Sequence, residues 1–306
     1  MPRIAYFGPS GTFTEMALAQ FESAGAFDGP VERVPAGSPP AALESVRDGS
    51  VDGAVVPIES SVEGPVPPTL DALAAGARLQ IVAETELDVS FTIVGRPGAV
   101  LADVRTIRAY PVAAAQVRMW IEKQLPGVAV ESASSNAGAA EDVAAGLADA
   151  AVSTALAGAR LGLDVLADNV ADFSGARTRF VLVTMPRPVP AATGSDRTSV
   201  VLQLSHEPGS LVGAMAEFST RGIDLTRIES RPTRIEFGTY RFYLDCSGHV
   251  EDTAVAEALK ALHRKHTVRF LGSWPTATPG GRRPPSDEEA ADWLRRVRAG
   301  ETEGTN

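Results

Sequence analysis

Two polar segments in the first third of the chain each follow a strand-like run and hold side chains suited to catalysis. The segment Gly8–Glu15 (GPSGTFTE) leads into a helix-like run, so its glycines permit close backbone approach and the helix start offers free N–H groups to an anion. The segment Pro57–Gly64 places the carboxylate of Glu59 and the hydroxyls of Ser60 and Ser61 after an apolar strand. Each segment could also be an ordinary capped turn, so both are candidates only.

A third candidate is Thr178-Arg179-Phe180, which opens the apolar run Val181–Val183. Arg179 borders a strand that should be buried, and a buried charge needs a partner of opposite sign. That partner is either a structural carboxylate or an anionic ligand. Arg179 is therefore a candidate for anion binding.

The types of side chain that are absent limit the chemistry further. The first 200 residues contain no histidine, no cysteine and a single lysine, Lys123, and the whole chain has one cysteine, Cys246. A histidine-dependent triad, a histidine-ligated metal and a thiol nucleophile are thus excluded from that region. The polar segments must work with hydroxyls, carboxylates, amides and arginines.

The overall charge argues against two classes of partner. The chain has 306 residues, with 28 Lys and Arg against 38 Asp and Glu, a formal net charge of -10. We therefore expect no general binding to nucleic acid or to an anionic membrane. The N-terminal residues lack the pattern of a signal peptide, so the sequence predicts a cytoplasmic protein.

Strand-like and helix-like runs alternate through residues 1–185, which predicts an α/β domain with largely parallel sheets and helices on both faces. The runs fall into two series, so we expect two lobes, the second at about residues 86–160. Clefts beyond the carboxyl ends of parallel strands are common ligand sites in such folds. The three polar segments would then border a cleft between the lobes.

A proline-rich segment, residues 186–196, predicts a linker. Residues 197–275 then show the order βαββαβ of a ferredoxin-like unit. Two loop segments there, Gly209–Val212 and Glu229–Pro232, follow or end strands. Residues 276–306 are rich in proline, glycine and charge, and we expect a mobile tail.

Six segments of the chain, taken in order, resemble the motifs of the prephenate dehydratase family. The segments are Gly8–Glu15, Pro57–Ser61, Pro111 with Gln116, Thr178–Phe180, Gly209–Val212 and Glu229–Pro232. The chain departs from the family pattern at Ser60, where asparagine is usual, and at Tyr110, where histidine is usual. The resemblance runs from Arg3 to about Trp274.

The resemblance implies a fold of two lobes, like a periplasmic solute-binding protein, followed by an ACT regulatory domain. It implies that prephenate is converted to phenylpyruvate, with loss of water and carbon dioxide, in phenylalanine biosynthesis. No metal and no cofactor are implied. Feedback inhibition by L-phenylalanine and assembly as a homodimer or homotetramer are implied as well.

The resemblance also implies roles for individual residues. Thr178 is expected to donate a proton or a hydrogen bond to the leaving hydroxyl, Arg179 to bind the pyruvyl carboxylate, and Glu59 to orient Thr178 or Ser60 or to act as the acid. The expected substrate-binding residues are Thr12, Ser60, Ser61, Gln116 and Phe180. The expected phenylalanine-binding residues are Gly209, Ser210, Leu211, Val212, Glu229, Ser230, Arg231 and Pro232.

Two other functions remain open from the sequence. An arogenate dehydratase would act on a substrate with an amine in place of the keto group. A non-catalytic amino-acid sensor would share the two lobes and the ACT-like unit, although it would have no use for Thr178, Arg179 and Glu59 together.

Overall fold

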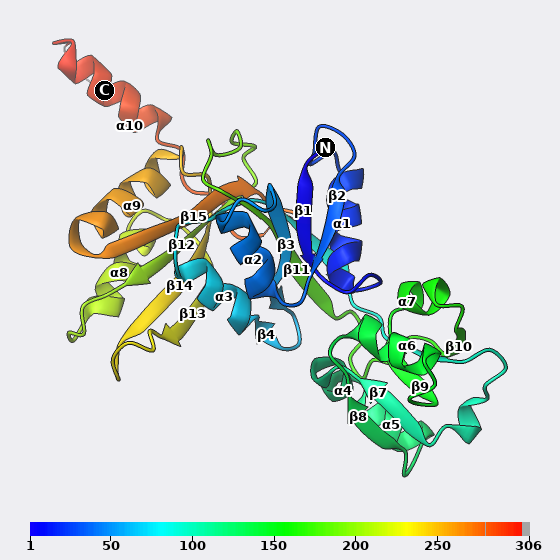
Figure 1. Ribbon diagram of the computed structural model, residues 1–306. Coiled ribbons are helices and arrows are strands. Elements are labelled where there is room, and N and C mark those ends of the chain that lie inside the picture. Colours follow the sequence, from blue (N-terminus) through cyan, green and yellow to red (C-terminus); the bar gives the residue numbers. More distant parts are fainter. Residues whose placement is uncertain (279, 302–306) are drawn as a thin grey trace. The chain divides into compact units, whose positions relative to one another are not determined.

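The computed structural model describes residues 1–278 and 280–301 (Figure 1). The chain divides into two compact units: Met1–Arg187, and a second unit that starts at Pro188. Within the described residues, no helix is both long and apolar enough to cross a membrane.

The first lobe of unit 1 is built on a mixed sheet with the strand order β2-β1-β3-β11-β5. Strands β1, β2, β3 and β5 run in one direction and β11 runs against its neighbours β3 and β5, so the sheet is rich in parallel strands. A short strand, β4, also pairs with β3. The strands are β1 (Arg3–Phe7), β2 (Glu32–Ala36), β3 (Gly53–Ser60), β4 (Gly64–Pro65), β5 (Gln80–Asp88) and β11 (Arg177–Thr184).

Helices cover both faces of this sheet, as the alternating sequence pattern predicts. Helix α1 (Phe13–Ser23) buries Leu18 and Phe21 against Phe180 and Leu182 on one face. Helices α2 (Pro39–Arg47) and α3 (Pro67–Ala74) pack on the other (Figure 1). The helix starts follow local chemistry, since the hydroxyls of Thr12 and Ser38 cap α1 and α2.

The second lobe is a smaller sheet with the order β10-β6-β9-β7-β8. Its apolar core lies between this sheet and helices α4 and α5, around Ile93, Ile107 and Val152. The chain enters this lobe after β5 and returns to the first lobe at β11. The elements are β6 (Thr92–Gly95), η1 (Leu101–Asp103), β7 (Thr106–Ala109), α4 (Pro111–Gln116), α5 (Arg118–Gln124), β8 (Ala129–Ser132), α6 (Asn136–Ala144), β9 (Ala150–Ser153), α7 (Ala155–Arg160) and β10 (Asp164–Ala167).

Two local features shape these elements. Strand β3 continues through Pro57, because its pairing with β1 has already stopped at Val55 and an irregularity in the β3–β11 register accommodates the proline. Residues 111–124 form two helices rather than one, since the backbone at Val117 leaves the helical region (φ -120°, ψ 8°).

Unit 2 contains the βαββαβ arrangement, with the sheet order β13-β14-β12-β15 and all neighbours antiparallel. Helices α8 and α9 bury Phe218 and Leu262 with Leu202 and Leu244 of the sheet. The elements are β12 (Asp196–Gln203), α8 (Ser210–Ser219), β13 (Leu225–Pro232), β14 (Tyr240–Ser247), α9 (Thr253–Lys265) and β15 (Thr267–Pro275), followed by α10 (Glu288–Arg298).

Candidate active site

The predicted catalytic segments meet at one edge of the first lobe's sheet. Strands β1, β3 and β5 end at this edge and β11 begins there, so the loop after Phe7, the turn after Ser60 and the start of β11 at Arg177 are neighbours. Both connections to the second lobe leave from the same edge. This is the place that the parallel strands predict for a ligand site.

Thr178 and Ser60 lie opposite one another in the β11–β3 pairing and therefore on the same face of the sheet. On its other side Thr178 pairs with Leu87, which packs against the core beneath α1. Thr178 is partly exposed at the end of its strand. Its hydroxyl is therefore on the α1 side of the sheet, at the edge where the second lobe is attached.

Ser60 and Ser61 organise the turn that follows β3. The hydroxyl of Ser60 accepts hydrogen bonds from the backbone N–H groups of Val62 and Glu63, at 3.2 and 3.3 Å. The backbone N–H of Arg177 donates to Ser61 Oγ at 2.9 Å, and the Ser61 N–H donates to the Arg177 carbonyl at 2.8 Å. These bonds fix the start of β11, and with it Thr178, against the end of β3.

Arg179 does not lie on the same face of the sheet as Thr178. The register shows no shift between Thr178 and Arg179, so consecutive side chains alternate and Arg179 points to the opposite face. There its guanidinium, only 6% exposed, donates to Glu59 Oε2 at 2.8 Å and to Glu84 Oε2 at 3.1 Å. The sequence left open whether Arg179 pairs with a structural carboxylate or with an anionic ligand, and in the structure it pairs with the carboxylates of Glu59 and Glu84. Glu59 thus contacts Arg179 rather than Thr178 or Ser60.

Phe180, expected from the resemblance to bind substrate, is buried in the core of the first lobe. Its ring is 2% exposed and belongs to the core formed by α1 and the sheet. An aromatic side chain two residues after Thr178 shares the face of Thr178 but lies deeper in the lobe. Phe180 therefore supports the position of Thr178 through packing.

Gln116 brings a predicted binding residue from the second lobe to this edge. Its side chain is buried at the end of α4, and its Nε2 donates to Glu63 Oε1, in the turn after β3, at 3.3 Å. Tyr110, where the family usually has histidine, precedes the same helix and packs against the core of the second lobe. The segment around Gln116 is thus placed against the turn that holds Ser60 and Ser61.

Thr12 has its hydroxyl engaged within the loop after β1. Thr12 Oγ1 donates to the Phe7 carbonyl at 2.9 Å and accepts from the Glu15 N–H at 3.4 Å. The adjacent Gly11 has φ +94°, and a Cβ there would lie 2.9 Å from Cβ of Ala157 on α7, so a side chain would collide with the second lobe. The loop is therefore shaped for close contact between the lobes.

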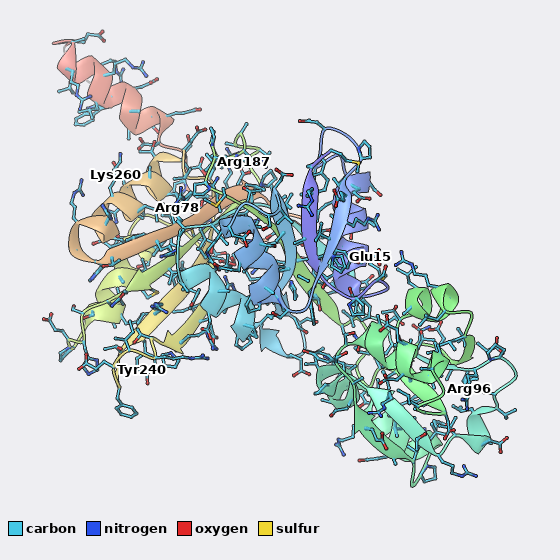
Figure 2. All side chains as sticks on the ribbon, in the orientation of Figure 1. Glu15, Arg78, Arg96, Arg187, Tyr240 and Lys260 are labelled. Carbon is cyan, nitrogen blue, oxygen red and sulfur yellow. The ribbon has the colours of Figure 1, made fainter. Side chains whose placement is uncertain are left out.

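Glu15 is a site residue whose partners no local pattern revealed. Glu15 lies at the start of α1 (Figure 2) and is 4% exposed. Its carboxylate accepts from the Gly11 N–H at 2.7 Å, from Ser10, from Arg33 at 3.2 Å and from Arg160 at 2.5 Å. Burial alone would raise the pKa of this carboxyl, but the hydrogen bonds from Arg160 and from the Gly11 N–H hold the pKa below its ordinary value. Glu15 is thus a buried carboxylate that stays charged.

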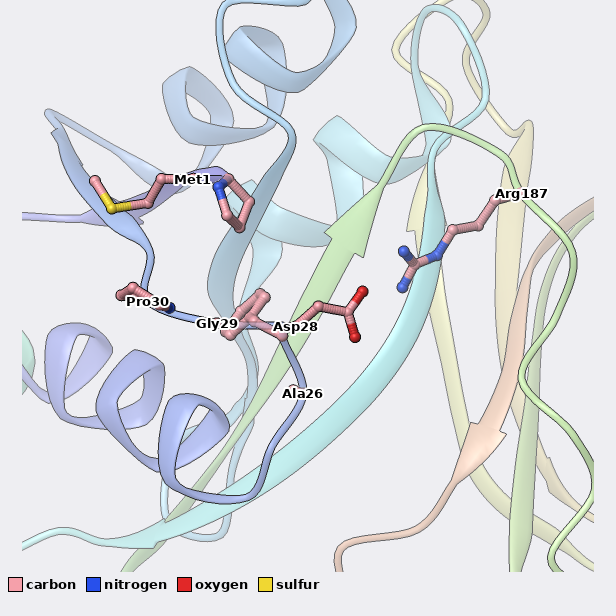
Figure 3. A pocket seen from close by; sticks show the side chains of 8 residues that line it. Met1, Ala26, Asp28, Gly29, Pro30 and Arg187 are labelled. Carbon is pink, nitrogen blue, oxygen red and sulfur yellow. The ribbon is translucent and has the colours of Figure 1, made fainter.

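A separate hollow of about 550 Å³ lies away from these residues. It is lined by residues that precede β1, by the loop after α1 and by Arg187, which follows β11, so it sits at the opposite edge of the sheet. Figure 3 shows Asp28 and Arg187 facing each other across it. No residue expected to bind substrate lines this hollow.

In unit 2, the two segments expected to bind phenylalanine lie at the same edge of the sheet. The end of β12 at Gln203 and the end of β13 at Pro232 both flank the start of β14. Gly209, at φ +86°, caps α8, and the hydroxyl of Ser210 donates to the Glu207 carbonyl at 2.8 Å. The segment Glu229–Pro232, which contains Ser230 and Arg231, forms the last residues of β13.

A hollow of about 180 Å³ opens at this edge. Ser210 and Leu211 line it together with Leu204, Tyr240 and Phe242. Among the expected phenylalanine-binding residues, Gly209, Val212 and the segment Glu229–Pro232 do not line it. Val212 is 73% exposed and lines a different hollow with Met215 and Leu225. The hollow combines the start of helix α8 with apolar and aromatic side chains.

The chain resembles known proteins along nearly its whole length. A family described as prephenate dehydratase matches residues 4–187. The prephenate dehydratase of Mycobacterium tuberculosis strain H37Rv is 60% identical over 310 residues, covering 100% of this chain and 97% of the relative. The crystal structure of a prephenate dehydratase from Arthrobacter aurescens in complex with L-Phe superposes with a TM-score of 0.88 at 39% identity, covering 97% of this chain and 100% of the other.

A further solved structure belongs to a protein described with a different activity. GqqA, described as a novel type of quorum quenching acylase, matches with a TM-score of 0.77 at 31% identity, covering 90% of this chain and 98% of that chain. Fold and sequence together place our chain among two-lobed α/β lyases that carry a second, ferredoxin-like unit. Within that class, the chain belongs to the prephenate dehydratase family.

Proposed function

We propose that the chain converts prephenate to phenylpyruvate, at the edge of the first lobe where Thr178, Ser60 and Gln116 meet. The observation that carries this proposal is the 60% identity to a curated prephenate dehydratase along the whole chain. The ring carboxylate leaves as carbon dioxide, the electrons of that bond make the ring aromatic, and the ring hydroxyl leaves as water after gaining one proton. Aromatisation supplies much of the driving force, so the site needs to bind, orient and donate hydrogen bonds.

Thr178 is proposed to donate the hydrogen bond that stabilises the departing oxygen. A hydroxyl with a very high pKa is a poor acid, so its contribution is electrostatic while negative charge develops on the oxygen. Its position supports this role, because Ser61 and Ser60 fix the start of β11 and Phe180 packs beneath it. The hydrogen-bonding groups of Thr12, Ser60, Ser61 and Gln116 are proposed to bind the rest of the substrate, together with the start of α1.

Arg179 is proposed to have a structural role. Its ion pairs with Glu59 of β3 and Glu84 of β5 tie three strands together at the edge that carries the site. Withdrawing this guanidinium toward a substrate would leave Glu59 and Glu84 without two charged donors. Such a rearrangement in a buried setting costs more than the single contact it would gain.

The test is a direct assay on the purified full chain with prephenate, in which phenylpyruvate is measured by its absorbance in alkali. Formation of phenylpyruvate with saturation kinetics supports the proposal, and no product contradicts it. A parallel assay with arogenate compares kcat/KM for the two substrates and decides between the dehydratases. An acylated homoserine lactone in the same series tests the activity suggested by the similarity to GqqA.

We further propose that L-phenylalanine binds unit 2 at the 180 Å³ hollow and inhibits the enzyme. Support comes from the Arthrobacter aurescens structure, which is a complex with L-Phe. The ring would pack on Leu204, Leu211 and Phe242, and the carboxylate would accept from N–H groups at the start of α8. Inhibition requires that the catalytic states differ in their affinity for phenylalanine. The test is a titration of the full chain with phenylalanine, in which calorimetry measures binding and the rate of phenylpyruvate formation measures inhibition.

A homodimer or homotetramer is proposed as the working assembly. Strand β13 is an edge of its sheet and exposes Ile228, so a second copy could pair with it and bring a second Glu229–Pro232 segment beside the hollow. Sedimentation of the full chain would give the subunit count.

The cytoplasmic location expected from the sequence stays part of the proposal.

A further inference from the structure

The loop Gly8–Thr12 and the adjacent Glu15 are hydrogen-bonded to the second lobe by two residues at the ends of helix α7. Thr154, which caps α7, donates from its buried Oγ1 to the Gly11 carbonyl at 2.7 Å. Arg160, in the last turn of the same helix, donates to Ser10 Oγ and to Glu15 Oε2. Glu15 in turn accepts a hydrogen bond from the Gly11 N–H. The start of α7 therefore contacts the carbonyl of Gly11 directly, and the end of α7 contacts the N–H of Gly11 through Glu15.

The Glu15 carboxylate is the link between Arg160 and this loop. Its two oxygens accept from Arg160, Ser10, Arg33 and the Gly11 N–H, so the position of the loop backbone depends on where the carboxylate is held. Arg33 comes from β2 and also pairs with Glu22, so it belongs to the first lobe's own framework. Of these donors, only Arg160 comes from the second lobe.

Arg160 differs from Arg179 in what its loss would leave behind. The Arg160 side chain is 40% exposed, and without it Glu15 would keep Arg33, Ser10 and the Gly11 N–H. Folding should therefore survive the loss of Arg160. What would be lost is the part of the loop's contact with the second lobe that runs through Glu15, since Thr154 would still donate to the Gly11 carbonyl.

We propose that Arg160 is a positioning residue, which acts through Glu15 to place the Gly8–Thr12 loop when the second lobe contacts the first. This inference rests on the proposed function, since it concerns the binding of prephenate at the Thr12 side of the site. Without Arg160 the competent loop conformation is populated less, and apparent affinity falls by that fraction. The expected signature is a raised KM with little change in kcat.

A double-mutant cycle with Arg160→Gln and Glu15→Gln tests the inference on the full chain. We expect Arg160→Gln to raise KM for prephenate by about tenfold, the equivalent of one charge-assisted hydrogen bond, and to leave kcat within about twofold. The double variant should have about the same KM as the single variant with the higher KM, because both changes break the same contact between Arg160 and Glu15. Arg160→Lys, which keeps a cationic donor, should recover most of the loss.

The control is Arg118→Gln, since Arg118 forms an ion pair with Glu122 on the same lobe but both side chains are largely exposed. This variant should keep the wild-type KM. If Glu15→Gln does not fold, as judged by circular dichroism, Ser10→Ala replaces it in the cycle because Ser10 also accepts from Arg160.

Two results would overturn the inference while leaving the proposed function intact. An unchanged KM in Arg160→Gln would show that the contact does not matter to binding. Effects that multiply in the double variant would show that Arg160 acts independently of Glu15, as it would if it touched the substrate. Failure of the wild-type chain to produce phenylpyruvate would instead reject the proposed function.

Discussion

Replacement of Arg179 separates the role that the structure supports from the one that the family resemblance implied. The guanidinium is 6% exposed and bonds Glu59 and Glu84, whose side chain is fully buried. Arg179→Met keeps much of the volume and removes the charge, so the Glu84 carboxylate loses its contact with the guanidinium at 3.1 Å. Breaking a buried ion pair by removing one partner costs about 3–5 kcal/mol.

The lower end of that range applies here, because Glu59 is 37% exposed and water can replace one of the two contacts. A loss of about 3 kcal/mol lowers the midpoint of thermal unfolding by roughly 6–12 °C for a unit of this size. The assay is thermal unfolding followed by circular dichroism, with KM for prephenate measured well below the transition. We expect KM to stay within about threefold of wild type, since Arg179 lies on the face away from Thr178.

The control for this experiment is Arg118→Met, which breaks an exposed pair and should cost no more than about 1 kcal/mol. The reasoning would be refuted by an Arg179→Met variant that unfolds at the wild-type temperature while its KM rises tenfold or more. That pattern would mean that the arginine leaves its carboxylates and holds the substrate.

Three further predictions concern other parts of the chain. Gly209→Ala should weaken inhibition by phenylalanine about tenfold, because φ +86° strains any other residue by about 1–2 kcal/mol, whereas Gly213→Ala, inside α8 with open space around it, should not. The Glu15 carboxyl has a lowered pKa, so its contribution to stability is complete above its ordinary pKa of 4.5 and is lost as the pH falls through the lowered value. The free energies of unfolding of Glu15→Gln and wild type, measured with urea, should therefore differ at pH 7 and converge in acid. Ile228→Lys, on the edge strand β13, should reduce the sedimenting mass if that edge joins two copies, and an unchanged mass would exclude this interface.

Much of the fold follows from local signals. Apolar runs of the right length mark β1 and β7 in the sequence, and a hydroxyl such as that of Thr12 before a helix-like run is typical of a helix cap, because it satisfies a free N–H. The order βαββαβ in the second unit is equally visible in the sequence. Such elements depend on neighbouring residues, so one sequence contains the information.

The site was harder to predict because it depends on register and on distant contacts. Which face Arg179 occupies is decided by how β11 pairs with β3 and β5, and a shift of one residue would reverse the answer. Arg160 and Glu15 are 145 residues apart, so no spacing rule connects them. The sequence did single out Glu15 within its motif, but only the structure shows that its carboxylate joins the two lobes.

The measurement that tests the central claim most directly is phenylpyruvate formation by two threonine variants of one strand. Thr178→Ala removes the hydroxyl at the site, and Thr184→Ala removes one at the opposite end of β11, where it bonds the Met185 carbonyl. We expect Thr178→Ala to lower kcat by about a hundredfold or more with little change in KM, as removal of a single transition-state donor does in other enzymes, while Thr184→Ala turns over normally. Near-normal turnover in Thr178→Ala would contradict the assignment of the site.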